Sequence, residues 1–301
     1  MANAKERSGT SENNKRLSKK LTLIIVSLIL ISAIIFITVW VLIANKALEI
    51  NSYTLKTEKL GSEFNGYRIA HISDIHNAEI GKDNEKLIKK LKTSCPDIIV
   101  ITGDLIDSRK TNIDISVNLA KEAISIAPCY YVTGNHESRI EEYDALRDSL
   151  KEIGVTVLEN DTVSIKKGTS AISISGINDP SFYKGPGSKS EKEIVKEQIE
   201  ALHTSQDSFT LLLSHRPELF PIYAEYEFDL VLSGHAHGGQ FRLPGIGGLF
   251  APNQGFFPKY DEGLFESDNT RMIVSRGIGN SLFPFRLNNK PEIILIELLT
   301  Y

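Results

Sequence analysis

The sequence predicts an α/β layered domain that follows one N-terminal apolar helix, and three observations lead to this fold class. An uncharged, strongly apolar run lies near the N-terminus. After it, short apolar runs bounded by turn residues alternate with helical patterns, as is typical of layered α/β domains. No internal repeat, low-complexity tract or long linker divides residues 50–301, so we expect a single large domain with a full core.

The N-terminal run predicts a membrane anchor. Residues 21–45 carry no charge, and 20 of these 25 residues are Leu, Ile, Val, Ala, Phe or Trp. A helix of this length reaches about 37 Å, enough for a bilayer core of roughly 30 Å. A cleaved signal peptide has a shorter apolar region of about 7–15 residues, although Ala44 and Ala47 keep cleavage open.

The charges around the run predict its orientation. Residues 1–20 contain six Lys or Arg and two Glu, whereas Lys46 and the residues after it mix both signs. The positive-inside rule therefore predicts a cytoplasmic basic tail (1–20), a single-pass anchor (21–45) in the cell membrane, and an extracytoplasmic domain (50–301). The whole chain has a net charge of −4, which leaves −8 beyond residue 20, so we expect no nucleic-acid partner.

Seven short apolar runs read as buried strands, at 68–72, 97–101, 129–133, 209–214, 229–232, 272–275 and 292–298. Between them, Asp83 is expected to cap a helix, apolar residues at helical spacing continue from Ile140 to Leu150, and Ser190 with Glu193 forms a capping box. Residues 158–177 show short strands without helices, which predicts an antiparallel part of the sheet.

The chain has only two cysteines, Cys95 and Cys129, and their strand registers place them too far apart for a disulfide.

Five polar blocks each lie at or just after the end of a predicted strand: residues 74–76 (Asp-Ile-His), 103–107 (Gly-Asp-Leu-Ile-Asp), 134–137 (Gly-Asn-His-Glu), 214–215 (Ser-His) and 234–237 (Gly-His-Ala-His). That edge of an open α/β sheet is where ligands bind. Five of the seven histidines fall in these blocks, a concentration that scattered core histidines would not produce. Carboxylate, imidazole and amide ligands together suit Mn, Fe or Zn.

In these five blocks the chain resembles the calcineurin-like metallophosphoesterases, from about residue 67 to residue 298. Within that family it looks most like the membrane-associated bacterial branch, because Gly-Gly-Gln follows the last histidine at 238–240 and Leu-Glu-Asn stands at 158–160. The resemblance implies a sandwich of two mixed β-sheets flanked by helices, with two divalent metal ions (Mn, Fe or Zn) at the strand ends.

The resemblance also implies seven metal ligands. Asp74, His76 and His237 would hold one ion, Asn135, His215 and His235 the other, and Asp104 would bridge both. His136 would be the catalytic histidine that binds no metal and protonates the leaving oxygen, because an imidazole titrates in the required range. Asp107 would hold that imidazole in position.

The function expected from this pattern is hydrolysis of phosphodiester or lipid-linked phosphate substrates by attack of a metal-bound hydroxide. Two alternatives stay open: a diphosphatase of the UDP-diacylglucosamine type, and a catalytically inactive metal-bound scaffold. Arg286 and Gln240 are candidates for binding a phosphate or a head group. The Gly- and Pro-rich residues 243–261 carry Phe250, Phe256 and Phe257, which form either a satellite core or an exposed apolar rim beside the metals, facing the bilayer.

Overall fold

The computed structural model describes residues 2–203, 208–280 and 283–301. The chain divides into two units. One is helix α1 (Ala2–Ala44) as far as Ile43, and the other is the domain Ala44–Tyr301. Within α1, residues Ser18–Ala44 are long and apolar enough to cross a membrane, a property that signal sequences share. The apolar residues from Leu21 to Trp40 are all exposed, so they form no core of their own.

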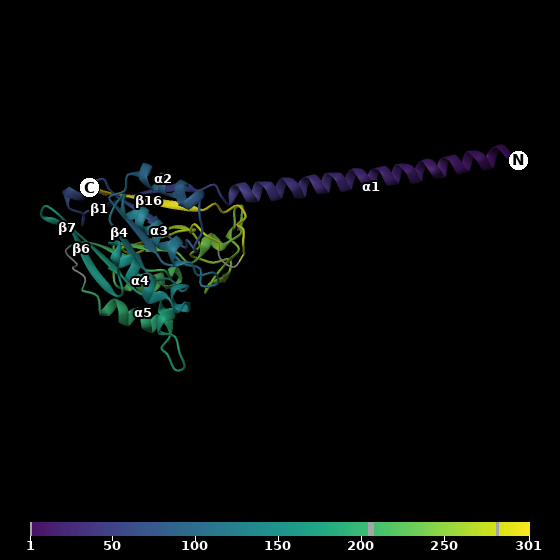
Figure 1. The fold of residues 1–301 in the computed structure, drawn as a ribbon. Coiled ribbons are helices and arrows are strands. Elements are labelled where there is room, and N and C mark those ends of the chain that lie inside the picture. The colour runs from purple at the N-terminus through teal and green to yellow at the C-terminus, as the bar shows by residue number, and fades with distance from the viewer. Residues whose placement is uncertain (1, 204–207, 281–282) are drawn as a thin grey trace. The chain divides into compact units, whose positions relative to one another are not determined.

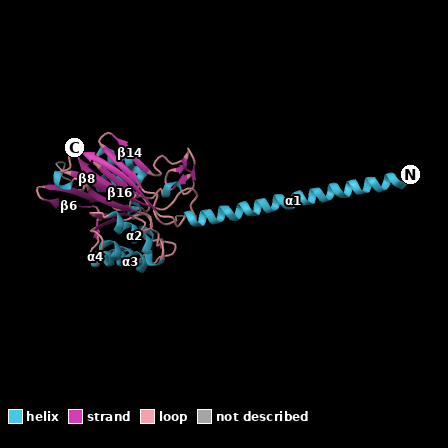
Figure 2. Ribbon diagram, turned by 90° about the horizontal axis from the view of Figure 1, so that it is seen from above, coloured by secondary structure: helices cyan, strands magenta, loops and turns pink. Residues whose placement is uncertain are grey.

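The domain is built on two six-stranded mixed sheets (Figures 1 and 2). In spatial order the first sheet consists of β1 (Glu49–Thr57), β16 (Glu292–Thr300), β2 (Tyr67–Ile72), β3 (Ile98–Thr102), β4 (Cys129–Val132) and β5 (Thr156–Val157). The second consists of β14 (Gly263–Ser267), β15 (Thr270–Val274), β9 (Leu230–Ser233), β8 (Phe209–Leu213), β7 (Ser170–Gly176) and β6 (Asp161–Lys167). The strands β2 to β5 are parallel, as are β7, β8, β9 and β15, so their carboxyl ends meet at one edge of each sheet.

Three hydrophobic cores give the domain four layers. Apolar side chains between the two sheets form the central core, which includes Ile69, Val100, Leu213 and Leu232. The outer face of the first sheet is covered by α2 (Glu85–Ser94), α3 (Ile113–Ile124) and α4 (Tyr143–Glu152), which lie together in Figure 2. The outer face of the second sheet is covered by α5 (Glu191–Glu200) and α6 (Phe220–Glu225). The two-sheet sandwich flanked by helices is confirmed.

All seven predicted strands are present, with ends that shift by up to two residues, and β6 and β7 form the expected antiparallel pair. The capping box at Ser190 and Glu193 is confirmed, and both cysteines are free. The predicted cap at Asp83 is wrong. Helix α2 begins at Glu85, Asp83 has a φ of 51°, and the side chain of Asn84 accepts a hydrogen bond from the Ile80 amide instead of capping the helix.

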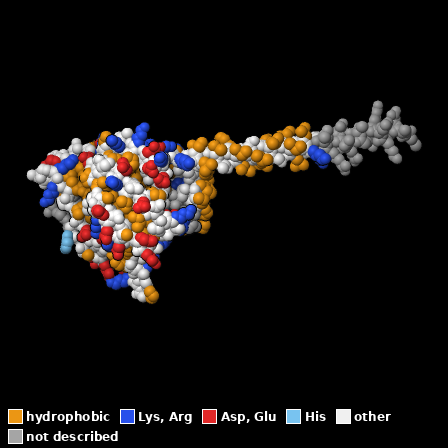
Figure 3. All heavy atoms as spheres, viewed as in Figure 1, with side chains coloured by type: hydrophobic (Ala, Val, Ile, Leu, Met, Phe, Trp, Pro, Cys, Tyr) orange, Lys and Arg blue, Asp and Glu red, His pale blue; other side chains and the backbone are white. Residues whose placement is uncertain are grey.

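Residues 242–256, which lack strand or helix periodicity, form two short antiparallel hairpins. The first pairs β10 (Arg242–Leu243) with β11 (Gly247–Gly248), and the second pairs β12 (Phe250–Ala251) with β13 (Gly255–Phe256). Phe250, Phe256 and Phe257 are all exposed, so the satellite-core alternative for this segment is wrong. Elsewhere on the face that Figure 3 shows, acidic and basic side chains are interspersed over the domain.

Candidate metal centre

All five polar blocks converge at the edge where the carboxyl ends of the two sheets meet. Asp74 and His76 follow β2, Asp104 follows β3, Asn135 and His136 follow β4, His215 follows β8, and His235 and His237 follow β9. Each of these side chains belongs to a buried residue. The eight residues come from five separate strand ends, yet the fold brings all of them to one place.

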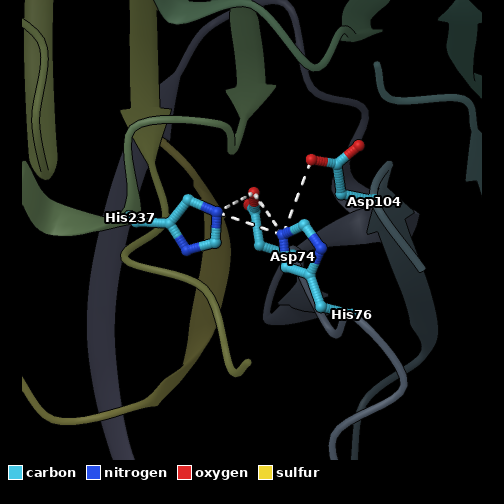
Figure 4. A group of neighbouring side chains, drawn as sticks. All are labelled: Asp74, His76, Asp104 and His237. Atoms are coloured by element: carbon cyan, nitrogen blue, oxygen red, sulfur yellow. Dashed lines mark hydrogen bonds and ion pairs between the residues drawn. The ribbon is translucent and has the colours of Figure 1, made fainter. Parts of the chain in front are cut away.

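The first group of donor atoms consists of Asp74, His76, Asp104 and His237 (Figure 4). The Nε2 atom of His237 lies 3.1 Å from Oδ1 of Asp74 and 3.1 Å from Nε2 of His76. The same His76 nitrogen lies 3.6 Å from Oδ2 of Asp104. Two ring nitrogens therefore point at each other with carboxylate oxygens around them, an arrangement that a shared cation between them would satisfy.

The second group consists of Asp104, His215 and His235. Oδ2 of Asp104 lies 3.3 Å from Nε2 of His215, which in turn lies 3.2 Å from Nδ1 of His235. Oδ2 of Asp104 therefore faces both groups. Asn135 lies beside them with a buried Oδ1 that has no hydrogen-bond partner among the described residues, an orphan acceptor that a metal ion would satisfy.

Contacts at the opposite ring nitrogens orient two of the histidines. Nδ1 of His215 donates a hydrogen bond to the carbonyl oxygen of Thr102 at 2.7 Å, so Nε2 faces the second group. Nε2 of His235 lies 3.2 Å from Oδ1 of Asn253 and 3.3 Å from Nη1 of Arg216, and these two residues hold the ring with Nδ1 toward the same group. Such contacts at the outer ring nitrogen are typical of metal-binding histidines.

The protonation preferences also fit a cation site. Burial alone would raise the pKa of Asp74, but the adjacent His237 holds it well below its usual value, so the carboxylate is charged. Burial, reinforced by Arg216 and His215, holds the pKa of His235 well below its usual range, so that ring is neutral and has a free lone pair. Two other rings hold protons more strongly: against the effect of burial, Asp104 raises the pKa of His215 to about 10, and Asp74 with Asp104 raises the pKa of His76. A divalent ion would take the place of these protons, and carboxylates, imidazoles and an amide oxygen are the donor set of Mn, Fe and Zn. The residues present therefore fit two divalent ions.

The backbone at the ligand positions is strained. Asp74, His76, Asp104, His235 and His237 all have a positive φ, between 48° and 66°. Such conformations of residues other than glycine cost on the order of 1 kcal/mol or more each and persist only where the surrounding structure enforces them. Gly134 shows how closely the loops approach, because a Cβ there would lie 2.3 Å from Oδ1 of Asp104.

Glu137 connects the loops that carry Asp104 and Asn135. Its buried carboxylate accepts hydrogen bonds from the backbone amides of Asp104 (3.0 Å), Leu105 (2.8 Å), Ile106 (3.2 Å) and Gly134 (2.8 Å). Burial, reinforced by Asp104, raises the pKa of Glu137 to about 7. Sequence reasoning expected only a cap or a hydrogen bond near the site from Glu137, on its place directly after His136, and assigned it no catalytic role.

His136 lies at the edge of the centre, and its Nδ1 accepts a hydrogen bond from the Ser108 amide at 3.0 Å. Oδ1 of Asp107 is 3.5 Å from the same nitrogen, but the Asp107 carboxylate accepts two hydrogen bonds from the Arg109 guanidinium at 2.9 and 2.8 Å. Ser108 therefore makes the nearest contact with Nδ1 of His136, and Asp107 is the partner of Arg109. Burial lowers the pKa of His136 to about 4, so its ring is neutral, with the proton on Nε2.

Arg286 and Gln240, the candidates for binding phosphate, direct most of their donors to backbone carbonyl oxygens. The guanidinium of the fully buried Arg286 donates to those of Arg276 and Gly279 and also lies 3.4 Å from Nδ1 of His237. The Gln240 amide donates to those of Phe283 and Phe285. Both hold the loop after β15.

Sequence reasoning missed Arg216, which is buried beside His235 and donates to both oxygens of Asp179, at 2.5 and 2.9 Å.

A cavity of about 350 Å³ opens beside the donor groups. Its polar lining comprises Asp104, Asn135, His136, His235, His237, Gln240, Asn253, Arg109 and Arg139. Its apolar lining comprises Ala236, Phe241, Phe250, Pro252 and Phe283. The cavity therefore joins donor atoms suited to metals, two arginines that suit an anionic group, and an aromatic wall.

The chain is similar to known phosphoesterases in sequence and in structure. Residues 67–239 match the model of the calcineurin-like phosphoesterase family. The metallophosphoesterase YkuE of Bacillus subtilis is 29% identical over 261 residues, covering 83% of this chain and 85% of that protein. The phosphodiesterase YaeI of Escherichia coli is 29% identical over 210 residues, covering 68% of this chain and 71% of that protein.

A zebrafish protein, described as a transmembrane protein with a metallophosphoesterase domain, is 28% identical over 257 residues, covering 81% of this chain and 56% of that protein. Among solved structures, TT1561 of Thermus thermophilus has a similar fold, with a TM-score of 0.50 and 13% identity over 71% of this chain and 90% of that one. The chain therefore belongs to the calcineurin-like phosphoesterase family, whose members are metal-dependent phosphoester hydrolases.

Proposed function

We propose that this protein is a membrane-anchored phosphoesterase that uses two metal ions to hydrolyse phosphodiesters or lipid-linked phosphoesters. The observation that carries the proposal is the pair of buried donor groups that share Oδ2 of Asp104 at one side of an apolar-walled cavity. Family membership supports the chemistry, and the cavity and the N-terminal helix support the finer assignments of substrate and location.

In this proposal Asp74, His76 and His237 hold one ion, Asn135, His215 and His235 hold the other, and Asp104 binds both. Two divalent ions bound there would lower the pKa of a water molecule between them and neutralise charge on the phosphoryl oxygens. The donor set suits Mn, Fe or Zn.

The remaining polar residues of the cavity act on the substrate directly. His136 presents an N–H at Nε2, because Nδ1 accepts from the Ser108 amide, and this N–H would hydrogen-bond to the leaving oxygen. To donate the proton itself the ring would have to react as an imidazolium, with a second proton on Nδ1, which lies 3.1 Å from Oγ of Ser108. Asp107 fixes the Arg109 guanidinium through two hydrogen bonds, and Arg109 lines the cavity with Arg139. Two guanidinium groups suit the negative charge of a phosphoester.

The apolar part of the cavity favours a substrate with an apolar portion next to its phosphate. Phe241, Phe250 and Phe283 provide a wall that a small phosphate monoester would leave uncovered. A lipid-linked phosphodiester meets both requirements. A lipid-linked diphosphate of the UDP-diacylglucosamine type does so as well, and the choice between the two is an outcome of the first experiment below.

Helix α1 supports the anchor, because its apolar segment Ser18–Ala44 spans 27 residues. The positive charges before this segment support an orientation with the domain outside the cytoplasm.

Substrate profiling tests the proposed activity. The purified full chain, loaded with Mn²⁺ or Zn²⁺ in detergent, is expected to hydrolyse phosphodiesters with an acyl or aryl group faster than phosphate monoesters, and to lose activity after chelation. Preference for a diphosphate would select the diphosphatase alternative. Turnover of no phosphoester by a chain that retains its metals would favour the inactive scaffold.

The Asp104→Asn substitution is expected to reduce metal content at both sites at once, because Oδ2 faces both donor groups and the amide carries no charge. Metal analysis by mass spectrometry after dialysis is the measurement. Asp107→Asn is the matched control and should retain both ions, since its carboxylate pairs with Arg109. Loss of only one ion from the Asp104 variant would show that this residue does not bridge.

The His136→Asn substitution should leave both metals bound and lower kcat by about 10²–10⁴-fold, the usual loss when a positioned proton donor is removed. His203→Asn, at an exposed histidine outside the centre, is the control and should keep full activity. A His136 variant that is metal-free, or as fast as the parent, would contradict its role as the acid.

Two measurements on whole cells test the anchor and its orientation. The full chain should stay in the membrane fraction after alkaline carbonate extraction. Cys95 is exposed and Cys129 is buried, so a membrane-impermeant maleimide should label the chain at Cys95 in intact spheroplasts. Recovery of the uncleaved chain in the soluble fraction would disprove the anchor, and labelling only after lysis would reverse the topology.

A further inference from the structure

Exposed apolar side chains gather on two loops beside the cavity. We call them the aromatic rim, which comprises Leu243, Ile246, Phe250, Phe256, Phe257, Phe283 and Phe285. Phe256 is 71% exposed, Ile246 65% and Phe257 60%, which is unusual for apolar side chains this large. Figure 3 shows apolar side chains concentrated along one edge of the domain. An exposed apolar patch of this kind marks an interaction surface.

The two loops of the rim are held together by specific contacts. The Gln240 amide donates to the carbonyl oxygens of Phe283 (3.2 Å) and Phe285 (2.6 Å). The Phe241 ring, which directly precedes the first loop, packs against the second, with its centroid 5.2 Å from that of Phe283 and 5.3 Å from that of Phe285. The rim is therefore a built surface that displays its aromatic rings in a fixed arrangement.

The rim continues into the cavity of the metal centre. Phe250 and Phe283 belong to both, since each is exposed at the surface and also lines the cavity. The Phe250 ring packs edge-on against that of Phe256, with 5.4 Å between their centroids. Whatever covers the rim therefore also borders the entrance to the site.

The chain itself indicates what covers the rim. Asn45 is the residue directly after the apolar segment Ser18–Ala44, and its side chain pairs with the backbone of Arg286 in both directions. Nδ2 of Asn45 donates to the Arg286 carbonyl oxygen at 2.9 Å, and Oδ1 accepts from the Arg286 amide at 2.6 Å. Arg286 is the neighbour of Phe285. A residue that follows a membrane span lies at the bilayer surface, so this pairing brings one end of the rim to the same surface.

We propose that the aromatic rim inserts into the interfacial layer of the membrane that α1 crosses, so that the metal centre opens toward lipid head groups. This inference rests on the anchor in the proposed function and adds a surface and a partner of defined chemistry, a lipid bilayer. Aromatic side chains favour the interfacial layer, where an apolar face contacts acyl chains beside polar head groups. A phosphoester at the head of a lipid then reaches the cavity along Phe250 and Phe283 without leaving the bilayer.

Quenching by brominated lipid tests the insertion without any need for catalysis. Trp40 is the single tryptophan and lies in α1, so Trp40→Phe gives a silent background. The full chain with Trp40→Phe and Phe256→Trp is reconstituted into vesicles of phosphatidylcholine and phosphatidylglycerol, with or without bromine on the acyl chains. Bromine on the acyl chains is expected to reduce the fluorescence of the residue 256 probe, because an inserted apolar surface lies about 5–10 Å deep at the boundary of head groups and acyl chains.

Tyr301→Trp in the same background is the matched control. Strands β1 and β16 run in parallel from the end of the domain that holds Asn45, and Tyr301 follows the far end of β16. Nine residues of strand place it roughly 30 Å from that end. This exposed aromatic should not be quenched.

Several results would overturn the proposal. Absence of quenching at residue 256, or equal quenching at residues 256 and 301, would show that the rim does not enter the bilayer. An unquenched residue 256 probe whose emission shifts with protein concentration would assign the rim to a second copy of the chain. If the chain fails to float with the vesicles, both the insertion of the rim and the membrane anchor are contradicted. If a chain without phosphoesterase activity is quenched, the insertion of the rim is supported and only the proposed activity is contradicted.

A second measurement concerns substrate delivery. Phe256→Ser with Phe257→Ser should lower the ratio of kcat/KM for a vesicle-borne phosphodiester to that for a soluble one by about tenfold, equivalent to about 1.4 kcal/mol. Neither residue lines the cavity. An unchanged ratio would contradict the proposal. Equal losses of kcat/KM on both substrates together with a lowered Tm would also contradict it, because the two phenylalanines would then be needed for stability.

Discussion

The arrangement of the centre depends on the position of one buried carboxylate, that of Asp104. Its Oδ2 faces His76 from one donor group and His215 from the other, while its Oδ1 accepts a hydrogen bond from the His136 amide at 2.8 Å. It therefore connects the end of β3, in the first sheet, with that of β8, in the second. The sandwich can bring these ends together only if the intervening loops are short and closely packed, which is why Gly134 cannot carry a side chain where it contacts Asp104.

Such a centre is unfavourable in the absence of cations. Buried carboxylates and imidazoles lose their hydration, and five ligand residues hold positive φ values. The backbone amides that converge on Glu137 offset part of this cost, because each satisfies a buried oxygen and restrains the Asp104 loop. Divalent ions would offset much of the remainder by binding the charged oxygens and the lone pairs that point at one another. Binding energy at this site is therefore also folding energy for the surrounding loops.

The sequence was most informative where periodicity and chemistry coincide. The central strands are short, uniformly apolar runs, so their polar ends stand out, and the parallel arrangement then implies that these ends meet. Strand β1 was not predicted, because seven of its nine residues are partly or fully exposed and only its pairing with β16 defines it. Three residues act through contacts with distant segments: Glu137, Ser108 and Arg216. Their partners lie about 30 positions away in the sequence for Glu137 and Ser108 and 37 positions away for Arg216. No local pattern encodes such contacts.

The hairpin β12–β13 shows why loop function was hardest to predict. Its sequence has no periodicity, because its residues serve two surfaces at once. Oδ1 of Asn253 at its turn lies 3.2 Å from Nε2 of His235 and helps to position that ring, while Phe250 and Phe256 on its strands pack against each other at the surface. In an amphipathic helix or strand, the residues of each face recur at a regular spacing along the sequence. In a tight hairpin, the turn decides which surface a residue faces, so no regular spacing appears. The same few residues can therefore orient a metal-binding histidine and present aromatic rings, which couples the position of the rim directly to the geometry of the centre.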